Sequence, residues 1–558
     1  MSSSIPVDLP GFATAKQGAV ALLVAWTAWK LIARWAMKDP LADVPGPDSK
    51  SYISGNLAEF FGPDSFQHQD KVAKEFPGVA KIPGIMMKPW LFIHDPKALY
   101  HILLKDQNSF DEPEELLRLN EVTFGKGLLA IHGQKHRKQR KMLNPVFSIA
   151  HMREMVPIFY NVGYRLRDSI RQQVSAGKIE INVLSWMSRT ALELIGQSGL
   201  GTTFDSLEPD SSPHPFYNSL QNLMQGQSKL NIPRFLLYPY VKDLGSPKFR
   251  RLVVDALPWN DLHAVRDMID VMEATSIEIY QRKKRALEQG DEALREQIGQ
   301  GKDAISILLK ANMLASEEDR LTEEELLGQI STLTFAAMDT TSNALSRILQ
   351  LLAENPEIQT RARKEIISAK QMHGELLYDE LVQLPYLDAI CRESLRLYPP
   401  VSIIVRVATQ DAVLPLSRPI TSPSGEKISE VTVPSGTQII LGAASSNKDP
   451  VLWGPDADEW KPERWLSPFP DSLVEARIPG VYSNLMTFSG GTRSCIGFKF
   501  SQLEMKVVLS ILLESFQFSP TDKTIKWLFN GITQPSVDEP TASGFAKLQL
   551  PLSVSLVA

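Results

Sequence analysis

Apolar residues recur along most of this chain with the spacing of amphipathic helices. Apolar positions that return every three or four residues predict long helices at Trp259–Leu287, Glu323–Glu354, Ile358–Lys370, Tyr386–Leu397 and Phe498–Phe516. Runs rich in β-branched and aromatic residues predict strands near residues 78–95, within 401–440 and after Lys547. Helical patterns dominate and no repeat or low-complexity linker interrupts them. We therefore expect one large, mostly α domain with a small β region, an α+β fold.

The N-terminal stretch departs from this pattern because its apolar residues are continuous. The run "GAVALLVAWTAW" at residues 18–29 carries no charge, and residues 11–37 reach the length of a bilayer if their lysines and arginine extend to its surfaces. A signal peptide or an amphipathic first helix is the alternative, but the small residues of a cleavage site do not follow the run. We therefore expect an uncleaved membrane anchor over residues 1–38.

A short segment rich in proline follows the predicted anchor. Pro45-Gly46-Pro47 cannot continue a helix, so residues 39–50 are predicted to form a hinge, and residues 51–558 the main domain. Lysine and arginine cluster just after the apolar run, which favours a main domain on the cytosolic side of the membrane.

The composition excludes several classes of protein. The 558 residues carry a formal net charge of −5, and this balance gives no global sign of a nucleic-acid partner. The only two cysteines are Cys391 and Cys495, too few for a disulfide framework in so long a chain. This scarcity indicates a reducing compartment or a protein that is indifferent to redox conditions.

The segment "FSGGTRSCIG", from Phe488 to Gly497, surrounds Cys495 with features unusual for a buried apolar residue. Its glycines allow tight turns, Arg493 brings a fixed positive charge, and the predicted helix after Gly497 places the sulfur beside a helix N-terminus. Such a position favours the thiolate, which can serve as a nucleophile or a metal ligand. Zinc needs several cysteine or histidine ligands, whereas one thiolate suffices for heme iron.

The same segment resembles the heme-binding loop of the cytochrome P-450 superfamily. The positions that define that loop are all present: Phe488, Gly491, Arg493, Cys495 and Gly497. The resemblance implies the cytochrome P-450 fold and makes residues 51–558 a heme-thiolate catalytic domain. It also implies that Cys495 is the axial ligand of the iron of protoporphyrin IX and that Arg493 contacts a heme propionate.

Two further segments agree with this resemblance. "ESLR" sets Glu393 and Arg396 on one face of a helix, and "WKPERW" contributes Arg464. Taken alone, Glu393 and Arg396 would form an ordinary surface ion pair. The resemblance implies instead a structural Glu–Arg–Arg network beside the heme.

The segment "AAMDTT" places Asp339 and Thr340 inside the longest apolar helix pattern, where polar groups are costly unless paired or functional. The plain interpretation is local hydrogen bonding to the helix backbone. The resemblance implies that the two residues supply protons for oxygen activation. Ala337 stands where the family usually has glycine, which affects the shape of the pocket more than the acid–alcohol pair.

A basic run near residue 136 is the remaining candidate for heme contacts. His136 and Arg140 lie where the family has a tryptophan and an arginine that reach a propionate, and Arg406 in "PPVSIIVR" is a second candidate. Either ring can donate a hydrogen bond, so the contact survives the change to histidine. The other basic side chains of the run suit docking of an acidic electron donor.

The resemblance, which is greatest to fungal microsomal members, also implies a reaction and its partners. We expect a monooxygenase of the endoplasmic reticulum membrane that takes electrons from NADPH through a separate flavoprotein reductase, with cytochrome b5 as a further candidate donor. Its substrate would be a lipophilic small molecule, a terpenoid, steroid or aromatic compound of secondary metabolism or a xenobiotic. The alternatives are a peroxide-rearranging heme enzyme without a reductase and a non-catalytic heme sensor or carrier. Asp339 and Thr340 argue against both.

The same resemblance places substrate-facing residues in four stretches: Phe124 to Leu129, the helix around Phe335 and Ala336, Val401 to Val405, and Asn530 to Thr533. They are mainly apolar, as a lipophilic ligand requires. "LNIPRFLLYPY" at residues 230–240 is unusually apolar, and it forms either the lip of an access channel or part of the core.

Overall fold

The computed structural model describes residues 41–557 apart from 291, 293–297, 299–300 and 539–545. The predicted anchor at residues 1–38 and the first two residues of the predicted hinge lie outside this range. Within the described residues, no helix combines the length and the apolar character needed to cross a bilayer.

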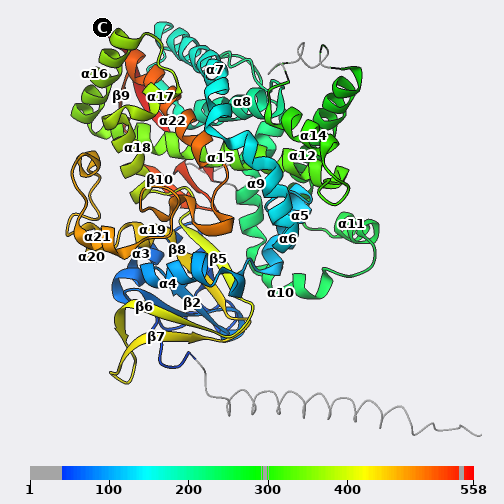
Figure 1. Cartoon of the computed structure of the whole chain (residues 1–558), viewed down its shortest axis with the longest axis vertical. Helices are drawn as coiled ribbons and strands as arrows, with labels where there is room; N and C mark the ends of the chain where they lie inside the picture. Colours follow the sequence, from blue (N-terminus) through cyan, green and yellow to red (C-terminus); the bar gives the residue numbers. More distant parts are fainter. Residues whose placement is uncertain (1–40, 291, 293–297, 299–300, 539–545, 558) are drawn as a thin grey trace, which may run out of the picture.

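Helices make up most of the described chain and form the upper and right-hand parts of the molecule in Figure 1. The long ones agree closely with the periodicity of the sequence, since α12, α15, α16, α18 and α22 all fall on predicted segments. The α-helices are α2 (Leu57–Phe61), α3 (Ser65–Glu75), α4 (Pro96–Tyr100), α5 (Glu114–Phe124), α6 (Gly133–Leu143), α7 (Ile149–Ser175), α8 (Val183–Leu194), α9 (Pro215–Lys229), α10 (Asn231–Val241), α11 (Pro247–Ala256), α12 (Asn260–Gln289), α14 (Ala304–Leu314), α15 (Glu323–Glu354), α16 (Pro356–His373), α17 (Tyr378–Gln383), α18 (Pro385–Leu397), α19 (Ala443–Asn447), α20 (Pro450–Trp453), α21 (Asp471–Ala476) and α22 (Phe498–Ser515).

The strands form small sheets, the largest in the lower part of Figure 1. That sheet has the order β1-β2-β8-β5-β3, with β2 and β8 parallel and the other pairs antiparallel. The other sheets are β10-β11-β12, β4-β13-β9 and the hairpin β6-β7. The strands are β1 (Val79–Pro83), β2 (Pro89–Ile93), β3 (Phe110–Asp111), β4 (Glu180–Asn182), β5 (Ile403–Ala408), β6 (Ala412–Thr421), β7 (Lys427–Val433), β8 (Gln438–Gly442), β9 (Phe516–Ser519), β10 (Ile525–Phe529), β11 (Thr533–Val537), β12 (Lys547–Leu548) and β13 (Pro551–Leu556).

Helix α15 is the central element of the helical part (Figure 1). It begins with a capping box, in which the Thr322 hydroxyl accepts from the amide of Glu325 and the Glu325 carboxylate accepts from the amide of Thr322. It packs against α8, α12, α18, α22 and β11. Because neighbours cover it on most sides, its polar residues are buried and each needs a hydrogen-bond partner.

The apolar segment near residue 235 is helical and partly exposed. The stretch before α9, residues 206–214, contains neither helix nor strand. Residues 231–241 form helix α10, and its Leu237 and Tyr240 are 54% and 83% exposed. The expectation that this segment is core is therefore wrong at those two positions.

Candidate active site

The loop that carries Cys495 is held in place by its own backbone and by a neighbouring helix. The amide of Cys495 donates to the carbonyl of Phe488 across 2.9 Å, which closes the loop. From α6, Arg140 donates through Nη1 to the carbonyl of Ser494 at 2.6 Å and through Nη2 to the Ser494 hydroxyl at 3.2 Å. Gly497 is the N-cap of α22, so the helix starts directly after the cysteine loop.

The three glycines of this loop differ in whether the surrounding protein requires a residue without a side chain. Gly491 has φ +69°, and a Cβ on it would lie 2.0 Å from the carbonyl oxygen of Leu103. A Cβ on Gly490 would lie 2.1 Å from the carbonyl oxygen of Pro479. The protein's own backbone therefore requires glycine at both positions. At Gly497 the nearest atom would be 3.9 Å away, so packing within the protein does not demand glycine there.

The thiol of Cys495 is accessible but lies among many protein atoms. Its side chain is accessible, yet burial raises the pKa of its thiol, because protein atoms surround the site on most sides. The amide of Gly497 and the charge of Arg140 lower this pKa, but burial outweighs them. The helix start therefore favours the thiolate, as expected, without outweighing the effect of burial. A bound metal ion would add to this preference.

On α15, one face of the helix is less buried than the rest. Ala336, Ala337 and Thr340 are partly accessible in a stretch whose other residues are buried, and their spacing places them together. The Thr340 hydroxyl donates to the carbonyl of Ala336 at 2.7 Å. Helix α22, which follows Cys495, is one of the elements that pack against α15.

Asp339 lies beside Thr340 but points into the protein. It is 2% exposed, and its Oδ1 accepts from Gln534 Nε2 of β11 at 3.1 Å. Asn343, one turn later on α15, donates through Nδ2 to the carbonyl of Asp339 at 2.6 Å and approaches Oδ1 at 3.4 Å. Burial raises the pKa of Asp339 to about 7, because the two amides only partly compensate for lost hydration. At neutral pH this carboxyl can therefore both hold and release a proton.

The basic candidates gather around His136 on α6. Burial, together with the charges of Arg493, Arg140 and Arg406, lowers the pKa of His136 to about 3. Its imidazole is therefore neutral at pH 7. Residues from α6, β5 and the cysteine loop thus meet at one place, although they are far apart in the sequence.

Two carboxylates that the sequence did not single out share the arginines of this cluster. Arg493 Nη1 lies 3.2 Å from Glu112 and Nη2 lies 3.6 Å from Asp111, while Arg406 Nη1 lies 3.7 Å from Glu112. The separation of 3.6 Å is an ion pair but not a hydrogen bond, so Arg493 Nη2 is buried without a hydrogen-bond acceptor among the described residues. Nothing in "FDEPEE" marked these carboxylates as site residues.

This donor set fits heme. Three guanidiniums, those of Arg140, Arg406 and Arg493, lie around His136 and outnumber the two carboxylates beside them. The buried and unused donor of Arg493 suits the propionates of heme. Arg140 differs from expectation because its guanidinium hydrogen-bonds Ser494 and so holds the cysteine loop. Together with the accessible thiol of Cys495, these residues would bind an iron porphyrin.

Phe488 lies at the base of the cysteine loop, in contact with two other aromatic rings. Its ring centre lies 5.4 Å from that of Tyr482 and 6.1 Å from that of Phe498. These contacts fix the turn at Met486–Phe488 that precedes the two glycines. Its position supports the loop.

A fully buried ion-pair network lies behind the cysteine loop. Arg396 makes two bonds of 2.8 Å to the carboxylate of Glu393, and both side chains are 0% exposed. Arg464 approaches Glu393 at 3.4 Å, and the indole of Trp465 donates to it at 2.9 Å. Arg396 also donates to the carbonyl of Asn447. The network ties α18 to residues 447–465, the segment before the cysteine loop.

The four predicted substrate-facing stretches lie against α15 or against one another. The rings of Phe124 and Phe335 stack with centres 4.7 Å apart. Gly127 and Gly328 let the loop after α5 touch α15, since a Cβ on either would clash with the backbone of the other segment. The amide of Thr533 donates to the carbonyl of Pro400 at 2.8 Å, which joins the other two stretches.

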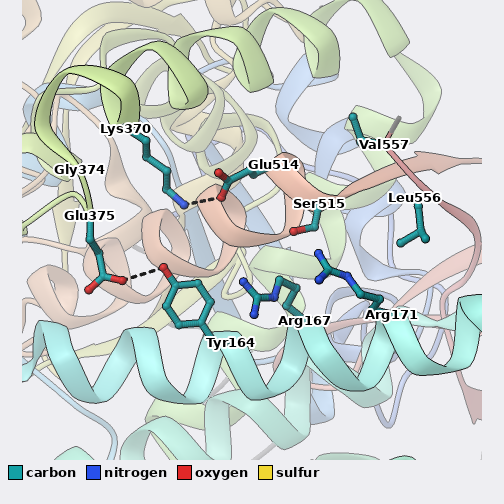
Figure 2. A pocket seen from close by; sticks show the side chains of 10 residues that line it. All are labelled: Tyr164, Arg167, Arg171, Lys370, Gly374, Glu375, Glu514, Ser515, Leu556 and Val557. Carbon is teal, nitrogen blue, oxygen red and sulfur yellow. Dashed lines mark hydrogen bonds and ion pairs between the residues drawn. The ribbon is translucent and has the colours of Figure 1, made fainter.

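A separate surface pocket of about 620 Å³ lies between α7, α16 and the end of α22 (Figure 2). Lys370 pairs with Glu514, and the hydroxyl of Tyr164 donates to Glu375 at 2.7 Å. Cys495 precedes α22 whereas Glu514 lies near its end, so a rise of about 1.5 Å per residue separates them by roughly 25 Å. This pocket therefore lies apart from the cysteine loop.

Comparison with known proteins agrees with the fold and the site. Residues 45–538 match the family model described as Cytochrome P-450. The chain is 48% identical to cytochrome P-450 monooxygenase 91 of Postia placenta over 96% of this chain and 97% of that protein. It is 43% identical to ganoderic acid synthetase of Ganoderma lucidum, over 92% and 94% of the two chains, and 37% identical to the cytochrome P-450 monooxygenase eriI of Hericium erinaceus, over 98% of each. The chain therefore belongs to the cytochrome P-450 family.

Family membership settles the class of reaction. The protein is a monooxygenase, an oxidoreductase, and its relatives over nearly the whole chain are fungal enzymes of the same class. The family also implies heme with a thiolate ligand, which the accessible Cys495 and the arginine cluster can accommodate.

Proposed function

We propose that this protein inserts one oxygen atom into a lipophilic small molecule, with electrons that NADPH supplies through a separate flavoprotein reductase. The single observation that carries the proposal is the pairing of an accessible thiol at Cys495 with a buried acid and a hydroxyl on α15, Asp339 and Thr340. A heme carrier or sensor has no use for a buried carboxyl that ionises near pH 7.

Bound heme supplies the iron at which molecular oxygen is activated. The chain's own residues position that group and manage protons. Cys495 would hold the iron through its sulfur, and Arg406, Arg493 and neutral His136 would offer donors to the propionates. Arg140 holds the loop from behind through Ser494. Asp339 takes up a proton, and Thr340 lies next to it on the partly accessible face of α15.

A lipophilic substrate is supported by the residues that line the approach. Phe124, Phe335 and the segment 401–405 are mostly apolar, and burial of apolar surface is what such a pocket offers a ligand. One relative is named a ganoderic acid synthetase. We propose a terpenoid, steroid or aromatic substrate for this chain.

Attachment to the endoplasmic reticulum membrane, with the main domain in the cytosol, is proposed from the apolar N-terminal run and from α10 and α11. Large apolar side chains are exposed on and next to these helices: Leu237, Tyr240, Val241, Leu244, Phe249, Leu252 and Leu257. Apolar side chains gathered in this way suit a lipid surface. In Figure 1 the two helices lie at the lower right edge of the molecule.

The reductase, or cytochrome b5 as a further donor, would dock on α6. This helix exposes Lys135 and Arg137 on the outside, while its Arg140 reaches the cysteine loop on the inside. An acidic donor bound there would lie close to Cys495. Charge reversal at Lys135 and Arg137 should slow electron transfer and weaken its dependence on salt, whereas reversal at exposed Lys526, on β10, should not.

Turnover of a defined panel tests the proposal. The full-length protein and its reductase in microsomes receive NADPH together with ganoderic acid, less oxidised terpenoids, steroids and polycyclic aromatic hydrocarbons. We expect an oxygenated product whose formation requires oxygen, NADPH and the reductase. Cys495→Ala should abolish both the thiolate spectrum of the reduced carbon monoxide complex and turnover. Product formation from a peroxide without reductase, or heme without any turnover, would favour the two alternatives.

A further inference from the structure

Helix α15 and strand β11 meet at Asp339 through two amide side chains. Gln534, 1% exposed, donates from β11 to Oδ1 of Asp339 at 3.1 Å. Asn343, 2% exposed, donates from the next turn of α15 to the carbonyl of Asp339 at 2.6 Å and lies 3.4 Å from Oδ1. The amide nitrogens of Gln534 and Asn343 therefore both approach Oδ1 of the carboxyl. We refer to Gln534 and Asn343 as the amide clamp.

The other side of the carboxyl is buried without a donor. Among the described residues, no hydrogen-bond partner reaches Asp339 Oδ2, and the same holds for the amide oxygens of Asn343 and Gln534. All three atoms are acceptors, so the cluster lacks protons rather than lone pairs. If Oδ2 is protonated, its O–H group supplies a hydrogen-bond donor that the cluster otherwise lacks.

The electrostatic surroundings of Asp339 are simple. Within the described chain, the causes that shift its pKa are burial, which raises it, and the hydrogen bonds from Gln534 and Asn343, which lower it. No charged side chain from the helices and strands packed on α15 contributes. The clamp is therefore the protein's main means of favouring the ionised form.

We propose that Gln534 and Asn343 are positioning residues that fix Oδ1 of Asp339 towards the protein and leave Oδ2 as the atom that accepts and releases the proton used in oxygen activation. The proposal rests on the proposed function, since it assumes that Asp339 delivers protons. Oδ2 takes up one proton from the bulk solvent and gives it up towards the oxygen under reduction, whose electrons come from NADPH through the reductase. The carboxyl is unchanged after each cycle.

Infrared difference spectroscopy of the heme-loaded protein tests the clamp without turnover. The stretch of the protonated Asp339 carboxyl is followed against pH, and Asp339→Asn assigns it by its loss. Gln534→Leu removes the donor, so the carboxyl should stay protonated to higher pH than in the wild type. Gln534→Glu keeps the shape of the side chain but places a second carboxyl beside that of Asp339. It should therefore raise the protonation midpoint of Asp339 more than Gln534→Leu does. A Gln534→Glu, Asp339→Asn double variant identifies the band of the new carboxyl.

Turnover gives an independent measurement on the same variants. With the panel compound oxidised fastest, Gln534→Leu should lower product per NADPH by about tenfold, the value of one hydrogen bond to a charged group, and raise hydrogen peroxide correspondingly. The alkaline limb of the rate profile should move with the infrared midpoint. Ser536→Ala, on the same strand but bonded to Val537 and Lys547, is the matched control and should leave both unchanged.

The outcomes separate the two proposals. Equal midpoints in the wild type, Gln534→Leu and Gln534→Glu would overturn the clamp, as would a normal product yield in Gln534→Leu. A purely structural role predicts that the isosteric Gln534→Glu resembles the wild type. If no panel compound is oxidised while the order of midpoints holds, the proposed function fails and the clamp remains.

Discussion

Single residues in this protein are constrained by the hydrogen-bond partners and the space that the surrounding chain provides. Asp339 keeps a carboxyl in a place where its charge is costly, and within the described part of the chain two amides reduce that cost. Gly491 has a positive φ and no room for a Cβ, whereas Gly497 has ordinary dihedral angles and no close neighbour. Residues of the same type therefore need separate physical reasons even within one loop.

Asp339→Asn should stabilise the fold above neutral pH. The folded carboxyl has a pKa of about 7 against a reference of 3.8, so the folded state binds the proton more tightly and loses stability as pH rises from about 4 to about 7. Above that range the penalty is constant at about 4 kcal/mol, since each unit is worth about 1.4 kcal/mol. Urea unfolding of both proteins across this range should show the difference growing with pH. A pH-independent difference would contradict the prediction.

Gly491→Ala and Gly497→Ala should have different effects. At Gly491 the left-handed backbone costs at least about 1–2 kcal/mol, and the clash with Leu103 adds to it, so the denaturation midpoint should fall. At Gly497 the change should alter the free energy of unfolding by less than about 1 kcal/mol. Its methyl group can only enter space that the protein leaves unfilled, so heme content should fall instead. Heme-to-protein ratios check this, and equal effects in the two variants would contradict it.

Whole elements are joined to the cysteine loop by buried polar contacts. Helix α6 holds the loop through Arg140, and α18 holds the preceding segment through Glu393 and Arg396. Burying such an ion pair costs hydration free energy. Removing one partner costs more, because the other partner then remains as an unpaired charge inside the protein. They make the geometry of the loop depend on helices far away in sequence.

Glu393→Gln should destabilise the protein by about 3–5 kcal/mol, because it leaves Arg396 charged and fully buried. The midpoint temperature of thermal unfolding and the heme content should both fall. Asp458→Asn is the matched control, since it breaks an ion pair with Lys74 whose side chains are 57% and 64% exposed. We expect a change of at most about 1 kcal/mol there. If both variants lost a similar amount of stability, the buried network would contribute no more to folding than an exposed ion pair.

At the scale of the molecule, heme binding should be coupled to folding. The accessible thiol, the arginine cluster and the partly accessible face of α15 come from distant segments that only the folded chain brings together. A ligand that binds only the folded state stabilises it, by about 2.7 kcal/mol at a hundred times its dissociation constant.

Heme removal should therefore lower Tm, and reconstitution with heme should restore it. Cys495→Ser should show a smaller rise on addition of heme, because the axial thiolate is missing. Differential scanning calorimetry at fixed protein concentration measures the shift. An unchanged Tm on reconstitution of the wild type would contradict the coupling.

The long helices and the cysteine loop could be predicted from the amino-acid sequence. Periodicity predicts α15 over Glu323–Glu354 because a helix packed on most sides needs apolar residues at every turn, and the five residues around Cys495 carry their own signature. Short helices such as α19 and α20 have too few turns to show a period.

Which residues meet in space depends on how the helices and strands pack together. This packing places Gln534 of β11 on Asp339, Glu112 between Arg406 and Arg493, and Arg140 against Ser494. These contacts join segments separated by more than a hundred residues, and a local pattern carries no information about a partner at that distance. The structure also adds an opposing effect at the Cys495 thiol, because the loss of hydration that raises its pKa depends on the atoms packed around it in space.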